Sequence, residues 1–352
     1  MVSRVVYGKG SITALPEILA QQRKSGQAFV YLIDDVFEQN PEFLNLLPRD
    51  AEDHKLFISA AKEPTTQQVD EIVSRLGQLL GNAPSGIIGI GGGTLLDIAK
   101  AVSVMLTNSG SAADYQGWDL VQKPAIYHIG IPTISGTGAE VSRTAVLIGP
   151  QKKLGINSDF TPFDQVILDP DLCVGIPHDQ WFYTAMDCFI HCVEALNGTY
   201  LNEFSKTYGK TAYDLCLTVF NHANYNSDEN REKLMMASWH GGMSIAYSQV
   251  GIAHALSYGL SYLLGIRHGI GNCMAFEHLE TYYPEGVRQY KNFKKIHNIN
   301  LPKGVTKHLS EAELDKMTSI AWSLSPLWEN ALGKDWQQKI SKEAIKSIYS
   351  NI

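Results

Sequence analysis

The spacing of apolar residues differs between the two halves of the chain. In the first half, short runs rich in β-branched residues alternate with stretches of helical spacing. The runs at 28–34, 85–93 and 125–133 predict buried strands, and the stretches at 65–81 and 94–107 predict helices. Because strands that alternate with helices usually form a parallel sheet covered by the helices, we expect an α/β fold here.

A proline-punctuated stretch at 160–177 separates this pattern from the next. It contains the last strand that the sequence predicts, and apolar positions then recur at helical spacing almost to the end. The length of 352 residues also exceeds the roughly 250–300 residues at which single cores stop growing. We therefore predict an α/β domain over residues 1–171 and an all-helical domain over residues 172–352.

Composition and charge narrow the class of protein. Apolar residues make up 44% of the chain and charged residues 18%, which is typical of a globular protein with a large core. The formal net charge of −7 and the lack of a concentrated basic face argue against nucleic acid and anionic membranes as partners. No export signal is evident, and polar residues interrupt the most apolar long run, residues 251–266. We expect a cytoplasmic protein.

The five cysteines are sparse and odd in number, as expected of reduced thiols. Cys188 and Cys192 have helical i, i+4 spacing, which is also found in metal sites. On a helix they would point about 100° away from the neighbouring pair Asp187 and His191, so the two pairs cannot easily share one ion. We interpret both cysteines as small buried apolar residues.

A strand, a glycine triplet and a helix start follow one another at 86–100. Exposed backbone amides and the helix dipole at such a turn can hold a phosphate group. The candidate cofactor contacts at this turn are Gly91, Gly92, Gly93, Thr94 and Asp97. Thr94 and Asp97 also fit a capping box, in which their role is only to cap the helix. The pattern is not the G-x-G-x-x-G fingerprint, and the acidic residue expected about 20 positions downstream of that fingerprint is missing.

Two further features favour NAD as the cofactor. Asp34 ends the strand predicted at 28–34, where its carboxylate would bind an adenosine ribose and repel a 2′-phosphate, although it could equally just open the next turn. A second loop offers hydroxyl groups to a pyrophosphate or a nicotinamide ribose through Thr133, Ser135 and Thr137. Two such loops at strand ends are where doubly wound folds bind nucleotides.

A metal site is the best explanation for four polar residues in the second half. Asp187 and His191 lie one helical turn apart and leave the same face, although such a pair is also common as a hydrogen-bonded pair in a core. His254 and His268 would lie about 21 Å apart on one unbroken helix, so the helix must break between them, and Gly265 is a suitable place. The four side chains would then form an N/O site for iron(II), zinc or a similar divalent ion.

These motifs together resemble the iron-containing, metal-dependent alcohol dehydrogenase family. The glycine signature is matched by GGGTLLDIAK, the hydroxyl loop by PTISGTGAE, and the metal helices by MDCFIHCVEA and by GIAHALSYGL with RHG. The likeness runs from residue 5 to about residue 280. It implies a dehydroquinate synthase-like fold, NAD held by the two loops with Lys153 as a further contact, and a homodimer. The metal ligands that it implies are Asp187, His191, His254 and His268.

One position departs from the family pattern. Many members have a second histidine four residues after the third ligand, which is discussed as a proton carrier, whereas this chain has Tyr258. A tyrosine relays a proton only if its pKa is strongly lowered or if it belongs to a chain of hydroxyl groups. Tyr258 is therefore the candidate proton relay, and the identity of the general base stays open.

The resemblance implies oxidation of a primary alcohol to an aldehyde by hydride transfer to NAD, with the metal as Lewis acid. Segments 112–120 and 152–170 resemble the branch that oxidises the carbon-8 hydroxyl of 3-deoxy-D-manno-octulosonate in lipopolysaccharide sugar modification. The carboxylate of an acidic sugar would need a positively charged side chain to bind it, and Arg143 or Arg267 could supply one. For each arginine taken alone, we favour a surface or interdomain ion pair, and the final electron acceptor, NAD or oxygen, is open.

Three other functions fit the same motifs. A short-chain alcohol or polyol dehydrogenase would share every feature described above. A dehydroquinate synthase-like lyase would use NAD transiently and would release no net NADH. A protein that binds NAD and metal without turnover would account for the missing second histidine, but its ligand set would be unexpectedly complete.

Overall fold

The computed structural model describes residues 1–48, 50–222 and 224–352. Its contacts divide the chain into two compact units. The first unit comprises residues 1–134 and 139–174, and the second comprises residues 135–138 and 175–352. The sequence predicts a boundary after residue 171, and the division lies after Val174, with one short loop of the first half assigned to the second unit.

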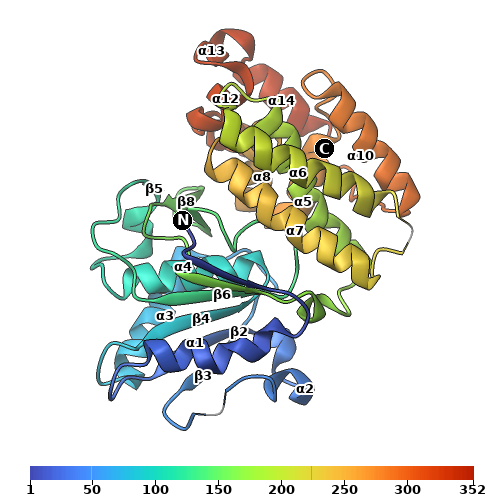
Figure 1. Ribbon diagram of the computed structural model, residues 1–352. Helices are drawn as coiled ribbons and strands as arrows, with labels where there is room; N and C mark the ends of the chain where they lie inside the picture. Colours follow the sequence, from blue (N-terminus) through green and yellow to red (C-terminus); the bar gives the residue numbers. More distant parts are fainter. Residues whose placement is uncertain (49, 223) are drawn as a thin grey trace. The chain divides into compact units, whose positions relative to one another are not determined.

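The first unit is built on a parallel sheet in the order β1-β9-β6-β4-β2-β3 (Figure 1). Its strands are β1 (Arg4–Tyr7), β2 (Phe29–Asp34), β3 (His54–Ile58), β4 (Gly86–Gly91), β6 (His128–Pro132) and β9 (Gln165–Leu168). The helices of this unit are α1 (Leu15–Gln22), α2 (Pro41–Leu44), α3 (Thr66–Leu79) and α4 (Gly93–Met105). The predicted parallel α/β fold is therefore confirmed, as are the strands and helices expected at the five ranges of the first half.

The two faces of this sheet are covered by different helices. On one face, Ile88 and Ile90 of β4 join a buried core with Leu15 and Leu19 of α1. Because successive side chains of a strand point to opposite faces, Gly89 lies on the other face, where a Cβ would come within 2.5 Å of the Ala99 Cβ on α4. The missing side chain lets α4 approach the sheet closely.

A second, small sheet in the first unit was not predicted. It has the order β5-β8-β7, formed by β5 (Gly117–Trp118), β7 (Thr144–Ile148) and β8 (Lys153–Asn157). The strand β7 alternates buried and half-buried residues and pairs antiparallel with β8. Short strands of this kind carry a weaker periodic signal than the fully apolar strands of the main sheet.

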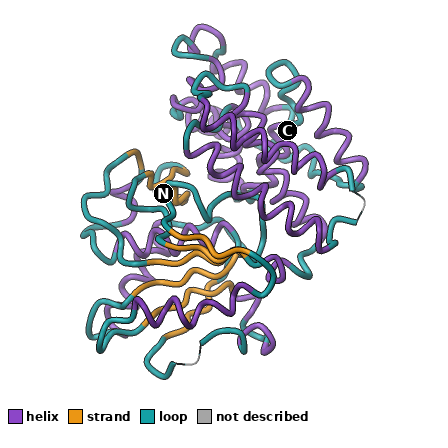
Figure 2. Tube along the Cα trace, viewed as in Figure 1, coloured by secondary structure: helices purple, strands orange, loops and turns teal. Residues whose placement is uncertain are grey.

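The second unit is helical throughout the described residues, as predicted (Figure 2). Its longer helices are α5 (His178–Leu196), α6 (Glu203–Phe220), α7 (Asp228–Ala246), α8 (Ile252–Leu264), α9 (His268–Phe276), α10 (Pro284–Ile296), α11 (Glu311–Trp322), α12 (Ser325–Leu332) and α14 (Lys342–Ser350), with one turn at α13 (Trp336–Lys339). Helix α5 is buried over almost its whole length, from Trp181 to Ala195. Among the described residues, no helix has both the length and the apolarity that crossing a membrane requires.

The predicted break between His254 and His268 is confirmed. Helix α8 ends at Leu264, and Gly265 follows in the left-handed conformation with φ of 65°, which glycine adopts without strain. Helix α9 then begins at His268. The break lets two side chains 14 positions apart approach the same point.

Candidate metal centre and nucleotide loops

Three polar side chains line one face of the buried helix α5. Asp187, His191 and Glu194 follow one another at i, i+4 and i+7, a spacing that aligns side chains on a helix. Their exposed fractions are only 1%, 4% and 0%. A buried polar face of this kind requires partners, because an unpaired buried carboxylate is costly.

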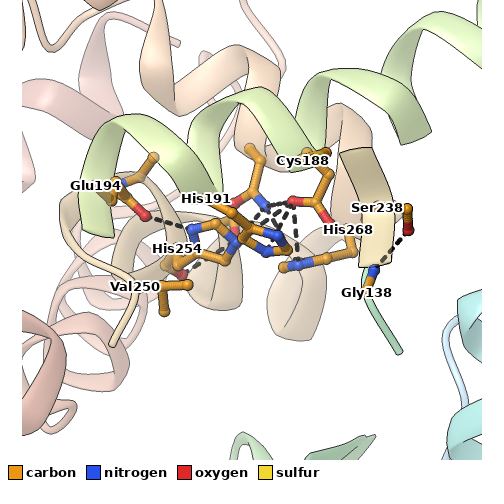
Figure 3. Close-up of polar contacts among 12 residues, drawn as sticks. Gly138, Cys188, His191, Glu194, Ser238, Val250, His254 and His268 are labelled. Atoms are coloured by element: carbon orange, nitrogen blue, oxygen red, sulfur yellow. Dashed lines mark hydrogen bonds and ion pairs between the residues drawn. The ribbon is translucent and has the colours of Figure 1, made fainter. Parts of the chain in front are cut away.

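The partners of Asp187 are two histidines, one from α8 and one from α9. These histidines, His254 and His268, lie close together in Figure 3. Oδ1 of Asp187 lies 3.3 Å from Nε2 of His254 and 3.6 Å from Nε2 of His268. These three residues form a group whose ligand atoms all lie within 4.8 Å of one another. With metal bonds of about 2.1 Å, neighbouring ligand atoms of a tetrahedral site stand roughly 3.4 Å apart. The observed spacing therefore fits a divalent ion.

His191 lies beside this group of three. Its Nε2 is 3.7 Å from Oδ1 of Asp187, and its ring stacks on that of His254 with centroids 4.7 Å apart. The structure thus brings all four predicted ligands together, with three of them in the tighter group.

The electrostatics of the group follow from burial and from its opposite charges. Burial would raise the pKa of Asp187, but His191 and His268 outweigh burial and hold that pKa well below its usual range. Burial lowers the pKa of His191 to about 4. For His254, burial alone would lower the pKa, but Glu194 and Asp187 raise it to about 9. The site thus has a strong preference for positive charge.

Glu194 connects α5 to the start of α8. Its Oε1 accepts a hydrogen bond of 2.6 Å from the backbone N–H of Ala253, and its Oε2 accepts one of 2.8 Å from Gly251, at the start of α8. The same carboxylate lies 2.5 Å from Nδ1 of His254. A proton held on Nδ1 leaves Nε2 to bind an ion. The sequence alone did not single out Glu194, although its i+7 spacing from Asp187 was a usable signal.

The donor set suits the ions that the sequence predicts. One carboxylate oxygen with imidazole nitrogens is a common set for iron(II) or zinc. In the described residues, Oδ2 of Asp187 is buried without a hydrogen-bond partner. An orphaned carboxylate oxygen at the convergence of histidines is expected where an ion completes the set.

In the first unit, Asp34 and the glycine turn come together. They end the neighbouring parallel strands β2 and β4, and a Cβ on Gly91 would lie 3.1 Å from the Asp34 Cβ. The Asp34 side chain accepts a 3.3 Å hydrogen bond from Val36, and burial raises its pKa. Thr133 also contacts this turn, because its backbone N–H donates a hydrogen bond of 3.0 Å to the backbone oxygen of Gly91.

The capping-box interpretation of Thr94 and Asp97 is wrong. Helix α4 begins at Gly93 with Gly92 as its N-cap and without a side-chain cap, so Thr94 is already inside the helix. Oδ2 of Asp97 accepts a 3.0 Å bond from the Val146 N–H, and its Oδ1 lies 3.3 Å from Nζ of Lys100. Asp97 therefore ties α4 to β7 and does not cap the start of α4.

Two lysines of the first unit are buried. Lys153, predicted to contact the cofactor, is 1% exposed on β8, and its Nζ lies 2.5 Å from Oε2 of Glu63. Lys100 was not predicted as notable, yet it is fully buried and donates to the Thr144 oxygen at 2.7 Å. Burial lowers the pKa of Lys100, against the attraction of Asp97.

The predicted hydroxyl contacts Ser135 and Thr137 belong to a loop of the helical unit. Gly136 has φ of 145°, and a Cβ there would lie 1.9 Å from the Thr184 oxygen, on α5 one turn before Asp187. The N–H of Gly138 donates to Oγ of Ser238 at 3.2 Å (Figure 3). The glycines thus allow this loop to lie directly on α5.

Tyr258 lies next to the predicted metal ligands. It follows His254 by one turn of α8, is 8% exposed, and its ring centroid lies 6.0 Å from that of His268. Its position is therefore compatible with the predicted role as a proton relay.

Comparison with known proteins agrees with this geometry. The model of iron-containing alcohol dehydrogenases matches residues 3–170, and that of the C-terminal domain of the Fe-containing alcohol dehydrogenase family matches residues 181–351. A crystal structure of sulfoacetaldehyde reductase from Bifidobacterium kashiwanohense in complex with NAD+ superposes with a TM-score of 0.80 at 19% identity. That superposition covers 98% of this chain and 96% of the other.

Two curated relatives extend the likeness to sequence. Alcohol dehydrogenase 4 of Schizosaccharomyces pombe is 29% identical over 66% of this chain, and the match spans 56% of that protein, less than two thirds of its length. The sulfoacetaldehyde reductase of Bilophila wadsworthia is 31% identical over 76% of this chain and 70% of its own length. Together with the two family models, this relative shows that the chain belongs to the iron-containing alcohol dehydrogenase family.

Proposed function

We propose that the protein is a metal-dependent dehydrogenase that interconverts a primary alcohol and its aldehyde with NAD. The observation that carries this proposal is the buried group of Asp187, His254 and His268, which fits a divalent ion in a chain of this family. The glycine turn with Asp34 beside it supports NAD as the cofactor, as does the NAD+ in the related crystal structure.

The roles of the residues follow from their contacts. A bound divalent ion would supply Lewis-acid chemistry, which lowers the pKa of a hydroxyl group. Asp187, His254 and His268 would hold that ion, and Glu194 keeps Nε2 of His254 directed at it. The N–H groups after β4 would hold the pyrophosphate of NAD. Tyr258 is the candidate to pass on the hydroxyl proton.

For the substrate, we propose an alcohol that carries an acidic group, and specifically the carbon-8 hydroxyl of 3-deoxy-D-manno-octulosonate. The segments that resemble this branch support the choice. Arg143 is the weaker candidate for the acidic group, because it is paired with Asp119 and Asp159 at 2.8 Å each. Arg267 is exposed and directly precedes His268, which makes it the better candidate.

The name of one relative points to a second candidate substrate. The Bilophila wadsworthia protein is named for sulfoacetaldehyde, a small aldehyde with a sulfonate group. Sulfonates and carboxylates are both bound by arginine through paired hydrogen bonds. Sulfoacetaldehyde is therefore the second candidate.

The test is turnover by the metal-loaded protein. The octulosonate with NAD, sulfoacetaldehyde with NADH, and short alcohols with NAD should be compared by following NADH, aldehyde and peroxide. We expect NADH and aldehyde from the octulosonate, and Arg267→Gln should raise its KM while Arg143→Gln leaves it unchanged. Absence of aldehyde would exclude this substrate, and absence of net NADH change with every alcohol and aldehyde would exclude the dehydrogenase.

A further inference from the structure

Lys100 is a fully buried lysine in the interior of the α/β unit. It lies on α4, two turns after the glycine turn at 91–93. A lysine is rarely buried completely, because its ammonium group needs polar or charged partners to replace water. Burial lowers the pKa of Lys100, whereas the carboxylates of Asp97 and Glu140 raise it. The contacts of this ammonium group therefore show which parts of the chain it holds together.

The ammonium group of Lys100 contacts the chain where β7 begins. Its Nζ lies 2.7 Å from the backbone oxygen of Thr144, 3.1 Å from Oγ of Ser142 and 3.4 Å from the backbone oxygen of Ser142. It also lies 3.3 Å from Oδ1 of Asp97, one turn earlier on α4. An ammonium group has three N–H donors, so these four acceptors can engage all of them. Since the other oxygen of Asp97 accepts a hydrogen bond from Val146, α4 holds the start of β7 at two points.

The other end of the segment that leads to β7 is tied to the glycine turn. Thr133 begins this segment, and its N–H donates a 3.0 Å hydrogen bond to the oxygen of Gly91. The segment 133–142 carries the hydroxyl groups that are predicted to contact the nucleotide. It is thus anchored at its start by the glycine turn and at its end by Lys100. Loops that are already fixed bind a shared ligand more tightly, because less ordering is needed on binding.

We propose that Lys100 is a positioning residue for the nucleotide, which fixes the end of the segment 133–142 to the helix that begins at the glycine turn. Lys100 acts through Ser142 and Thr144 and does not itself contact the ligand. This inference rests on the NAD-dependent function proposed above. A ligand that reaches both loops should depend on Lys100, whereas a ligand that reaches only the glycine turn and Asp34 should not.

The test compares the binding of NAD and of AMP to the full chain by calorimetric titration. AMP offers an adenosine ribose to Asp34 and one phosphate to the glycine turn. NAD adds a second phosphate and the nicotinamide ribose, which suit the hydroxyl groups of the segment 133–142. Lys100→Met removes the ammonium group and keeps nearly the length of the side chain. We expect its affinity for NAD to fall about tenfold and its affinity for AMP to change by less than about twofold.

A purely structural role of Lys100 predicts a different result. Lys100→Met should lower stability in either case, because it leaves buried acceptors without a donor. Chemical denaturation measured in parallel gives the folded fraction, to which the affinities refer. If the folded fraction binds NAD as tightly as the wild type does, the inference is overturned. An equal loss of affinity for NAD and AMP would also overturn it, since Lys100 would then act on the glycine turn alone.

Lys55→Met is the matched control. Lys55 is exposed on β3, the outer strand of the main sheet, so we expect unchanged affinities for NAD and AMP. If Lys100→Met does not fold, Lys100→Gln takes its place, because its shorter side chain keeps a donor but cannot reach both Ser142 and Thr144. The same selective loss of NAD affinity is expected. Failure of the wild-type protein to bind NAD would overturn the proposed function itself and this inference with it, a result distinct from any variant outcome.

Discussion

Single side chains decide how well this site can hold an ion, and Glu194 illustrates the point. Its carboxylate binds two backbone N–H groups at the start of α8 as well as Nδ1 of His254. None of these three contacts is visible as a motif in the sequence, because the partners lie about 60 positions away. Glu194 therefore fixes the position of His254, and it is not one of the three residues of the clustered group.

Glu194→Gln should therefore weaken metal binding. The glutamine keeps the size of the side chain but turns an N–H donor toward groups that are themselves donors. We expect the affinity for a divalent ion to fall about 10- to 100-fold, measured by competition with a chelator. Glu229→Gln, at an exposed residue paired with Lys233, should leave the affinity unchanged. Equal affinities for Glu194→Gln and the wild type would exclude the positioning role.

The raised pKa of His254 predicts that metal binding releases a proton. With a pKa of about 9, the metal-free His254 is charged at neutral pH, and its Nε2 must lose a proton to bind an ion. His191, with a pKa of about 4, is already neutral there. The proton competes with the ion, so affinity should rise about tenfold per pH unit between about pH 7 and 9 and then level off.

Calorimetric titrations in buffers of different ionisation enthalpy test this prediction. They should count about one proton released per ion at neutral pH and almost none above about pH 10. An affinity that does not change with pH in this range would show that His254 does not carry the proton.

At the scale of elements, the apolar pattern predicted the strands β2, β4, β6 and β9 of the main sheet but not β1 and β3. The helix break at Gly265 was predicted from the distance between His254 and His268 on an unbroken helix. Fully apolar strands such as β4 give a strong local signal in the sequence. Gly265, shortly before His268, gives a similarly strong signal for the end of a helix. The small sheet and the true partners of Asp97 could not be predicted, because they depend on contacts between α4 and β7, some 50 residues apart. The approach of Asp187, His254 and His268 to one another was predictable, but the contacts of Asn272 with this group were not, since they arise only when three helices meet.

The loop at 135–138 gives a prediction at this scale. Gly136→Ala would place a Cβ against the backbone of Thr184 and force an alanine into a φ of 145°. We expect the helical unit to lose at least about 2 kcal/mol of unfolding free energy, measured by chemical denaturation. Gly77→Ala, on helix α3 with open space around it, should instead stabilise by about 0.5–1 kcal/mol. An unchanged midpoint for Gly136→Ala would mean that this loop can leave α5 freely.

At the scale of the whole molecule, the predicted ligands all belong to one of the two units. Asp187, His254 and His268 come from three helices of the helical unit, so an ion would link these three helices. Removal of the ion should therefore affect the two units unequally.

Hydrogen exchange with and without a chelator measures this effect. An ion at 100 times its dissociation constant stabilises the state that binds it by about 2.7 kcal/mol. We expect its removal to speed amide exchange in α5, α8 and α9 and to leave β2 and β4 unchanged. Uniform acceleration in both units would indicate that the ion stabilises the chain as one cooperative unit.

The buried thiols give each unit an internal reporter of opening. All five cysteines are buried, with Cys173 in the α/β unit and the others in the helical unit. Burial raises the pKa of Cys273, and only the thiolate reacts readily with alkylating reagents. A folded molecule should consequently resist alkylation, and the order in which Cys173 and Cys273 become labelled under mild denaturant would reveal which unit opens first.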